Sequence, residues 1–206
     1  MAKVEGLKEK VHYSLYDAFF VPAPPATGAA PTFKTSMADP RVIRFFVDVQ
    51  NKTPLETNMQ AAGTLPSQNS YEVRAMRVVV SSLLPRKDDT KIEKARLSIN
   101  EPEILGLLLY GSVTSLIVGE KIMIQQPTFG FPSGGGPAAG LASVATNGIA
   151  DPSAIFKFAE PVPITAQQNF RVEMQFPRDI PDGLADVHGP LRVWVMLDGY
   201  LIRDVQ

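Results

Sequence analysis

Two histidines supply all the imidazole groups that this chain of 206 residues can offer for catalysis or metal binding. His12 lies near the N-terminus, and His188 lies in the segment 186–190, which has the composition of a loop. A metal site in a β-barrel enzyme needs several histidines and a carboxylate on facing strands, and this sequence does not provide them. A nucleophilic serine in a Gly-x-Ser-x-Gly turn is also absent. We therefore expect no metal, no cofactor and no catalytic residue.

Glycines and acidic residues suggest further kinds of site, and each pattern is incomplete. The glycines at 134–136 could present backbone N–H groups to a phosphate, but no Lys-Ser/Thr pair follows and Pro137 removes a donor. The acidic residues at 88–89, and those at 179 and 182, lack the spacing of a calcium loop. Two carboxylates on neighbouring strands could cleave a glycosidic bond, and nothing selects such a pair. A hydrolase therefore stays a weak alternative.

Aromatic and basic residues suggest binding chemistry. Phe129, Phe131 and Trp194 could form a platform for sugar rings, although a lone tryptophan in an alternating strand more often packs in a core or an interface. Six arginines lie at strand positions that alternate with apolar residues, and their number roughly matches that of nearby acids: Arg44, Arg74, Arg77, Arg171, Arg192 and Arg203. We expect them to form ion pairs and not a nucleic-acid footprint.

The composition excludes several classes of protein. No cysteine is present, which excludes disulfides, thiolate metal sites and thiol nucleophiles. The 20 Lys and Arg residues nearly balance the 21 Asp and Glu residues, so we expect no general attraction to nucleic acid or to an anionic bilayer. Residues 1–10 are charged and no apolar run follows them, which argues against a signal peptide. The apolar runs are far shorter than the roughly 20 residues that cross a bilayer.

Alternation of apolar and polar residues predicts strands along most of the chain after residue 40. The clearest strand spans residues 169–176, where every second residue from Phe170 to Phe176 is apolar. Further strands are predicted at 41–50, 71–84 and 94–99, a corner at 161–163, and a hairpin of 113–118 with 121–126 around Gly119-Glu120. Within 71–84 the apolar phase slips by one residue near Ala75 and Met76, which predicts a β-bulge.

The segments between these strands predict one helix, one long loop and a closing hairpin. Residues 101–110 form the helix, because Asn100 can cap it and Glu103 completes a capping box. Residues 127–153 are rich in glycine, proline and small residues and are predicted to form a surface loop. Asp198-Gly199 is predicted to split residues 191–205 into a hairpin in which Trp194 faces Arg203.

Residues 1–40 differ from the rest and are predicted to form an N-terminal arm. Their proline-rich stretch at 21–31 excludes a helix and favours an extended path. Tyr13, Tyr16, Phe19 and Phe20 make this segment more aromatic than disordered segments usually are. We therefore expect the arm to dock, either on the chain's own barrel or on a neighbouring molecule.

These elements predict an all-β fold. Many strands separated by turn residues, with only one convincing helix, indicate an antiparallel sandwich or barrel of about eight strands. The predicted organisation is an extended N-terminal arm at residues 1–40 followed by one β-barrel domain at residues 41–206. No internal repeat of fixed period is present, which argues against propellers and solenoids.

Several motifs resemble the jelly-roll major capsid proteins of tailless icosahedral bacteriophages, a group often associated with an internal membrane. Three of these motifs are Arg44-Phe45-Phe46-Val47-Asp48, Gly63-Thr64-Leu65-Pro66-Ser67-Gln68 and Tyr71-Glu72-Val73-Arg74-Ala75-Met76-Arg77-Val78, with further motifs at 57–59, 119–122, 129–134, 168–173 and 197–201. The resemblance spans most of residues 41–206. It rests on packing and turn motifs, so no catalytic residue carries over.

The resemblance implies a single jelly-roll barrel that stands on a capsid surface. Such a protein would be made in the host cytoplasm, would be located in the virion, and would self-associate into trimeric or pseudo-hexameric capsomers of an icosahedral shell. Its partners would be copies of itself, other capsid proteins and an underlying membrane layer, without specific nucleic-acid binding. Several members of this group carry two jelly rolls in one chain, whereas residues 41–206 suffice for one.

The expected function is therefore that of a structural capsid protein that is not an enzyme. The candidate interface residues come from the arm, the long loop and the closing segment: Tyr13, Tyr16, Phe19, Phe20, Phe129, Phe131, Trp194 and Arg203. Packing within one chain is the alternative role for each of them. A carbohydrate-binding β-sandwich, lectin-like or receptor-binding, is the alternative function.

Overall fold

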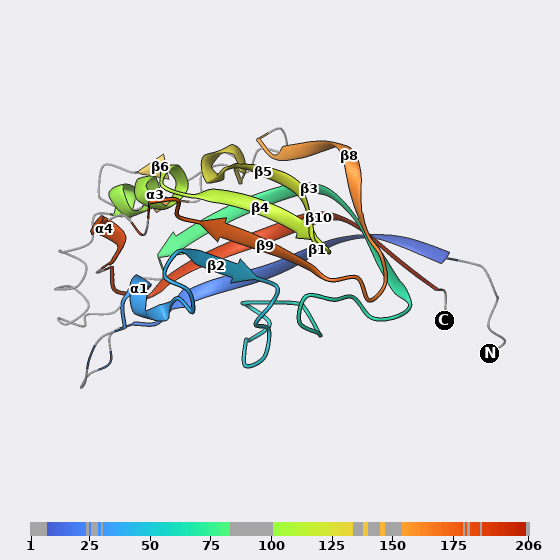
Figure 1. The fold of residues 1–206 in the computed structure, drawn as a ribbon, viewed down its shortest axis with the longest axis horizontal. Helices are drawn as coiled ribbons and strands as arrows, with labels where there is room; N and C mark the ends of the chain where they lie inside the picture. Colours follow the sequence, from blue (N-terminus) through green and yellow to red (C-terminus); the bar gives the residue numbers. More distant parts are fainter. Residues whose placement is uncertain are drawn as a thin grey trace.

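The computed structural model describes residues 8–23, 25, 29, 31–82, 101–133, 138–139, 145–146, 154–178, 180, 182–185 and 187–204. Two antiparallel sheets of four strands each form the body of the protein (Figure 1). The first sheet has the order β1 (Lys8–Val21), β10 (Leu191–Asp204), β3 (Asn69–Ser82) and β8 (Phe156–Ile164). The second has the order β2 (Val42–Phe45), β9 (Phe170–Gln175), β4 (Val113–Val118) and β5 (Lys121–Pro127).

The order of the strands is that of a jelly roll. Along the chain the first of these eight strands pairs with the last, β1 with β10, and the second pairs with the second to last, β2 with β9. The third pairs with the sixth, β3 with β8, and the two middle strands, β4 and β5, pair with each other. This folded ribbon of strand pairs alternates between the two sheets, which is the double Greek-key arrangement. The predicted all-β fold is therefore confirmed.

Short helices gather at one end of the sandwich, and the start of β1 and the end of β10 lie at the other (Figure 1). The predicted helix is confirmed as α3 (Glu101–Tyr110). Two helices of four residues each, α1 (Phe33–Ser36) and α4 (Asp182–Ala185), were not predicted. The remaining elements are a turn of 3-10 helix, η1 (Thr128–Gly130), and the short strand pair β6 (Ala138–Ala139) and β7 (Ala145–Thr146). No helix in the described ranges is long and apolar enough to span a bilayer.

The core lies between the sheets and follows the predicted alternation. In β9 the side chains of Phe170, Val172 and Met174 are buried, and so is Phe176 directly after the strand. In β3 the buried positions change phase as the sequence predicts. Residues 71, 73 and 75 are buried in the first half, and residues 76, 78 and 80 are buried in the second half.

A bulge accounts for this change of phase. The pairing of β3 with both of its neighbours shifts between Val73 and Ala75, so that Arg74 is an extra residue in the strand. The predicted bulge is therefore confirmed, one residue before the expected position. On the β8 side the same shift leaves residues 158–161 opposite Arg74, mostly before the predicted corner at 161–163, whose residues 162 and 163 pair regularly with β3.

The predicted closing hairpin is wrong. Strand β10 runs without a turn through Asp198 and Gly199 and pairs along its length with β1 on one side and β3 on the other. Trp194 therefore faces Ala18 and Val79, and it does not face Arg203. Gly199 lies beside the bulge, where the backbones of β10 and β3 come close together. A Cβ atom at this position would lie 1.9 Å from the Glu72 carbonyl oxygen. The glycine permits a close backbone approach and does not form a turn.

The predicted arm begins with a strand of the first sheet. All 14 residues of β1 pair with β10, so this part docks on the chain's own sheet, one of the two possibilities that the sequence left open. Strand β2 is shorter than the predicted 41–50, because Phe46 has a φ of 69° and ends the strand. The predicted hairpin of β4 and β5 is confirmed, with Gly119 at a φ of 61°. The predicted strand at 94–99 lies outside the described residues.

Candidate functional site

The described residues contain no group of three or more side chains that could hold a metal ion. The two histidines lie in different parts of the first sheet and its surroundings. The ring of His12 packs at 5.7 Å from that of Tyr200 on the neighbouring strand, and His188 Nδ1 lies 3.1 Å from the carbonyl oxygen of Pro31. Each imidazole therefore has a packing partner, and the structure does not bring the two together.

A buried ion pair joins β1 to the segment that follows β2. Asp17 pairs with Val195 in the sheet and lies on its inward side, where no part of the residue is exposed. Lys52 Nζ lies 2.9 Å from one carboxylate oxygen of Asp17 and 2.8 Å from the other. The backbone N–H of Phe46 donates a hydrogen bond of 2.7 Å to the same carboxylate. Burial raises the pKa of Asp17, because loss of hydration outweighs these favourable contacts.

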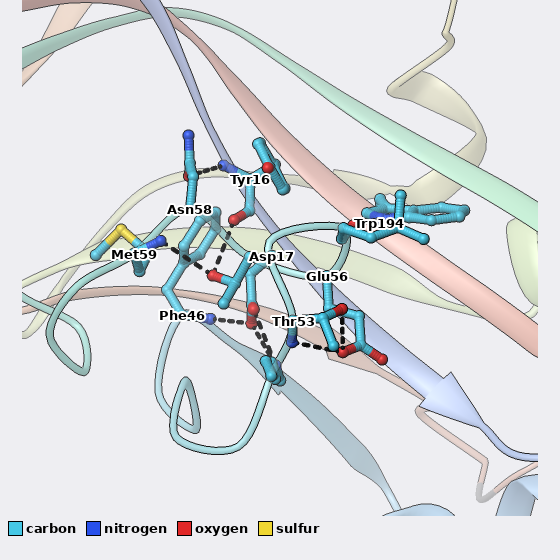
Figure 2. Close-up of polar contacts among 11 residues, drawn as sticks. Tyr16, Asp17, Phe46, Thr53, Glu56, Asn58, Met59 and Trp194 are labelled. Carbon is cyan, nitrogen blue, oxygen red and sulfur yellow. Dashed lines mark hydrogen bonds and ion pairs between the residues drawn. The ribbon is translucent and has the colours of Figure 1, made fainter.

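Further polar contacts fasten residues 46–60, which we term the strap, to β1 (Figure 2). The side chain of Asn58 accepts a hydrogen bond of 3.0 Å from the Tyr16 backbone N–H and donates one of 2.8 Å to the Ser14 carbonyl. Thr57 donates from its hydroxyl to the Tyr16 carbonyl at 3.1 Å. These contacts satisfy backbone groups along the free edge of β1. They close this part of the edge to pairing with another strand.

The strap also reaches the outer face of the first sheet. Trp194 Nε1 donates a hydrogen bond of 3.0 Å to the Leu55 carbonyl, and the Tyr16 hydroxyl donates to the Pro54 carbonyl. The Glu56 carboxylate oxygen Oε1 lies 3.9 Å from Arg192 Nη2. The other oxygen accepts hydrogen bonds from the backbone N–H and the hydroxyl of Thr53. Burial alone would raise the pKa of Glu56, but the Thr53 hydrogen bonds and the Arg192 charge lower it.

The interface candidates predicted from the arm and the closing segment differ in how much of their side chains is exposed. Tyr16 and Trp194 are half-buried beneath the strap. Phe20 is half-buried with the Arg192 guanidinium over its ring, and Phe19 packs edge-on against Phe33 at the core. The two remaining candidates are more accessible: Tyr13 is 38% exposed, and the side chain of Arg203, paired with Glu9, is 53% exposed.

The two loop phenylalanines have opposite environments. Phe131 is 1% exposed and packs against Phe156 in the core, so it offers no surface to a partner or a sugar. The alternative of packing within the chain therefore holds for Phe131. Phe129 is 51% exposed and stacks on Tyr110, which is 75% exposed. Tyr110 was missed because it directly follows a run of three leucines, a pattern that indicates burial.

Exposed apolar side chains also lie on the edge strand of the second sheet, near the end of β5 that is farther from this aromatic pair. Strand β5 is an outer strand of that sheet and exposes Ile122 and Met123. The sequence predicted this strand as one arm of a hairpin and did not identify its exposed apolar residues. An outer strand that exposes apolar side chains is an accessible contact surface.

All six arginines that were expected to form ion pairs do so. Arg44 and Arg171 pair with Glu173, and the other four pairs are Arg74 with Glu72, Arg77 with Asp198, Arg192 with Glu56, and Arg203 with Glu9. Asp17 and Lys52 were not identified from the sequence. The signal was available, since Asp17 occupies an inward position once residues 8–21 are recognised as a strand.

The resemblance to capsid proteins implied a jelly-roll fold, and the strand order of the structure agrees with that fold. This topology occurs in viral capsid proteins, in lectins and in cupins, so it fits both functions that the sequence left open. The described part of the chain lacks the histidine cluster of a metal-binding cupin. No protein-family model matches the chain, and no curated protein matches it in sequence.

Proposed function

We propose that this protein is a structural shell protein, a major capsid protein that self-assembles into the capsomers of an icosahedral virion. The observation that carries this proposal is the jelly-roll order of the strands in the two sheets. The motif resemblance to tailless bacteriophage capsid proteins supports the same function. Its partners are copies of itself in trimeric or pseudo-hexameric capsomers.

The surface that best suits contact between copies lies at the β5 edge. Ile122 and Met123 on this strand are 57% and 39% exposed, and the stacked pair of Tyr110 and Phe129 lies just beyond the strand. Apolar and aromatic side chains of this kind are enriched at the centres of protein interfaces. Repetition of one such contact around a symmetry axis builds a closed ring.

The test is the assembly state of the purified protein. We expect light scattering coupled to size-exclusion chromatography to show trimers or hexamers, and electron microscopy to show rings or particles. The variants Ile122→Asp and Phe129→Asp should shift the population toward monomers, whereas Val47→Asp, at another exposed apolar position, should not. A protein that stays monomeric at every concentration and never enters a particle would contradict the proposal.

A carbohydrate-binding sandwich is the second candidate, and the exposed aromatic pair favours it. Sugar rings stack on accessible aromatic faces, and Phe129 and Tyr110 present such faces at the surface. Binding on a glycan array that Phe129→Ala abolishes would support this function. Phe131→Ala is not a suitable test, because Phe131 is buried. An array without any signal would remove this candidate.

A further inference from the structure

Two adjoining hollows cross the outer face of the first sheet, and Arg77 lines both of them. The first has a volume of about 390 Å³ and is mainly apolar. Its walls include the half-buried rings of Tyr16 and Trp194 and the side chains of Leu55 and Met196. It can hold one or two apolar side chains of a ligand.

The second hollow has a volume of about 490 Å³ and carries an excess of positive charge. Arg74, Arg77 and Lys157 line it, together with His12, whereas Asp198 is the one carboxylate among the described lining residues. Most of the other lining residues are apolar, Phe158 and Ile155 being the largest, and Ser14 is polar. A ligand in this hollow therefore meets cations beside apolar side chains.

The single carboxylate is already satisfied within the protein. Arg77 donates a hydrogen bond of 3.0 Å to one oxygen of Asp198, and its Nε lies 2.7 Å from the other oxygen. Ser14 donates a further hydrogen bond of 2.5 Å to Asp198. Asp198 and Arg77 therefore neutralise each other at the junction of the two hollows.

The cations that remain face solvent. Arg74 has half of its side chain exposed, lies 3.4 Å from Glu72 and rests over the ring of Tyr200. Lys157 is exposed and has no acidic partner among the described residues. These two side chains are available to a negatively charged ligand without first breaking a buried contact.

We propose that the two hollows, together called the outer groove, bind an acidic peptide segment of a partner protein. An apolar side chain of the segment fills the hollow beside Trp194. Acidic residues that follow this apolar residue in the segment pass over the Arg77–Asp198 ion pair, and their carboxylates contact Arg74 and Lys157. The proposal does not depend on shell assembly, because every residue of the groove belongs to one chain.

The charge distribution favours a peptide over a nucleic acid. Binding to nucleic acid relies on several cations that each contact a phosphate. The outer groove offers two available cations and a large apolar half, which suits a ligand of mixed character. A short extended peptide with one leucine followed by acidic residues has this character.

The only tryptophan of the chain lines the groove and reports on its occupancy. The probe is an acetylated and amidated octapeptide without tryptophan, with leucines in its first half and four Asp and Glu residues in its second half. We expect titration of this peptide to shift or quench the emission of Trp194. The same peptide with Asn and Gln in place of Asp and Glu should bind at least tenfold more weakly, and added salt should weaken binding of the acidic peptide.

Two variants locate the binding site. Arg74→Gln and Lys157→Gln should each weaken binding of the acidic peptide by up to about fivefold, the range of an exposed charge pair. Lys121→Gln, at an exposed lysine of β5 on the second sheet, is the matched control and should leave binding unchanged. Thermal melts of all three variants should coincide with that of the wild type, because these side chains are exposed.

Several results would overturn the proposal. Equal binding of the acidic and amide peptides would show that the cations play no part. Absence of any emission change at millimolar peptide would show that the groove is not a peptide site. An equal loss of binding in Lys121→Gln would place the site elsewhere. Tighter binding of a single-stranded oligonucleotide than of the acidic peptide would assign the groove to nucleic acid.

Discussion

The ammonium group of Lys52 lies within 2.9 Å of both carboxylate oxygens of Asp17, a residue without exposed surface. The ion pair joins the first strand of one sheet to the strap that follows the first strand of the other. Lys52 keeps 20% of its side chain exposed, whereas the Asp17 carboxylate depends on its partners within the protein. The two residues therefore have unequal roles in stability.

Replacement of the lysine should be costly. Lys52→Met leaves a buried carboxylate without its counter-ion, and we expect it to lower the free energy of unfolding at pH 7 by about 3–5 kcal/mol. The loss should shrink as the pH falls. Removal of Lys52 raises the pKa of Asp17 further, so the variant gains more than the wild type from protonation of this group. Urea unfolding of both proteins at pH 7 and pH 5 measures the difference.

The matched controls are Lys121→Met, which removes an exposed lysine, and Asp17→Asn. The asparagine can still accept the Phe46 hydrogen bond, and Lys52 can turn toward water, so we expect a loss of only about 1–2 kcal/mol at pH 7. A Lys52→Met variant as stable as Lys121→Met would show that the ion pair contributes nothing.

Gly199 distinguishes a continuous strand from a hairpin turn. In the bulge a Cβ atom would lie 1.9 Å from the Glu72 carbonyl oxygen, so Gly199→Ala should lower the free energy of unfolding by about 3 kcal/mol or more. In a two-residue turn the same change would cost about 1 kcal/mol. Gly106→Ala in α3 is the control, because nothing lies within 4 Å of the added methyl group. It should raise stability by up to about 1 kcal/mol.

The sequence correctly predicted the elements whose local residue pattern agrees with the structure they adopt in the fold. Strand β9, the bulge in β3, helix α3 and the β4–β5 hairpin all follow from alternation, capping and turn residues. The failure at Asp198-Gly199 has a physical reason. The local preference of Asp198-Gly199 for a turn stabilises the chain much less than the pairing of β10 with β1 on one side and β3 on the other. The local sequence does not show that a strand has two neighbouring strands.

The candidate site was harder to predict than the fold. Alternation in residues 8–21 is blurred, because the first half of β1 is exposed on both faces, so the segment reads as an arm and the inward position of Asp17 is hidden. The ion pairs of the six arginines were predictable, since these residues alternate with apolar positions on the strands and acidic residues of similar number lie nearby. Which loop phenylalanine is buried was not predictable from glycine-rich surroundings.

Phe129 and Phe131 differ in burial, and replacing each of them tests this difference. Phe131→Ala empties a core position that is 1% exposed, and we expect a loss of about 3–5 kcal/mol. Phe129→Ala changes an exposed ring and should stay within about 0.5 kcal/mol of the wild type. Chemical denaturation of the two variants at a concentration where the protein is monomeric measures both. Similar losses for the two variants would contradict this difference in burial.

Glu173 and Asp17 should respond to pH in opposite directions. Burial alone would raise the pKa of Glu173, but hydrogen bonds from Arg171 and Gln175 and the charges of Arg171 and Arg44 lower it. A lowered pKa stabilises the fold above the ordinary value, and this contribution is lost as the pH falls through the folded value. Glu173→Gln should therefore cost about 1 kcal/mol at pH 7 and less at low pH.

The pKa of Asp17 is raised, so its contribution has the reverse dependence. Protonation of a group with a raised pKa favours the folded state, and the stability that it provides is lost as the pH rises through the folded value. The wild type should therefore gain stability relative to Asp17→Asn as the pH falls from 7 toward 4, whereas it should lose its advantage over Glu173→Gln only as the pH falls below the ordinary pKa of a glutamate. Comparison with each variant at the same pH removes the contributions of all other carboxyl groups. Parallel pH profiles for the two variants would contradict the opposite shifts.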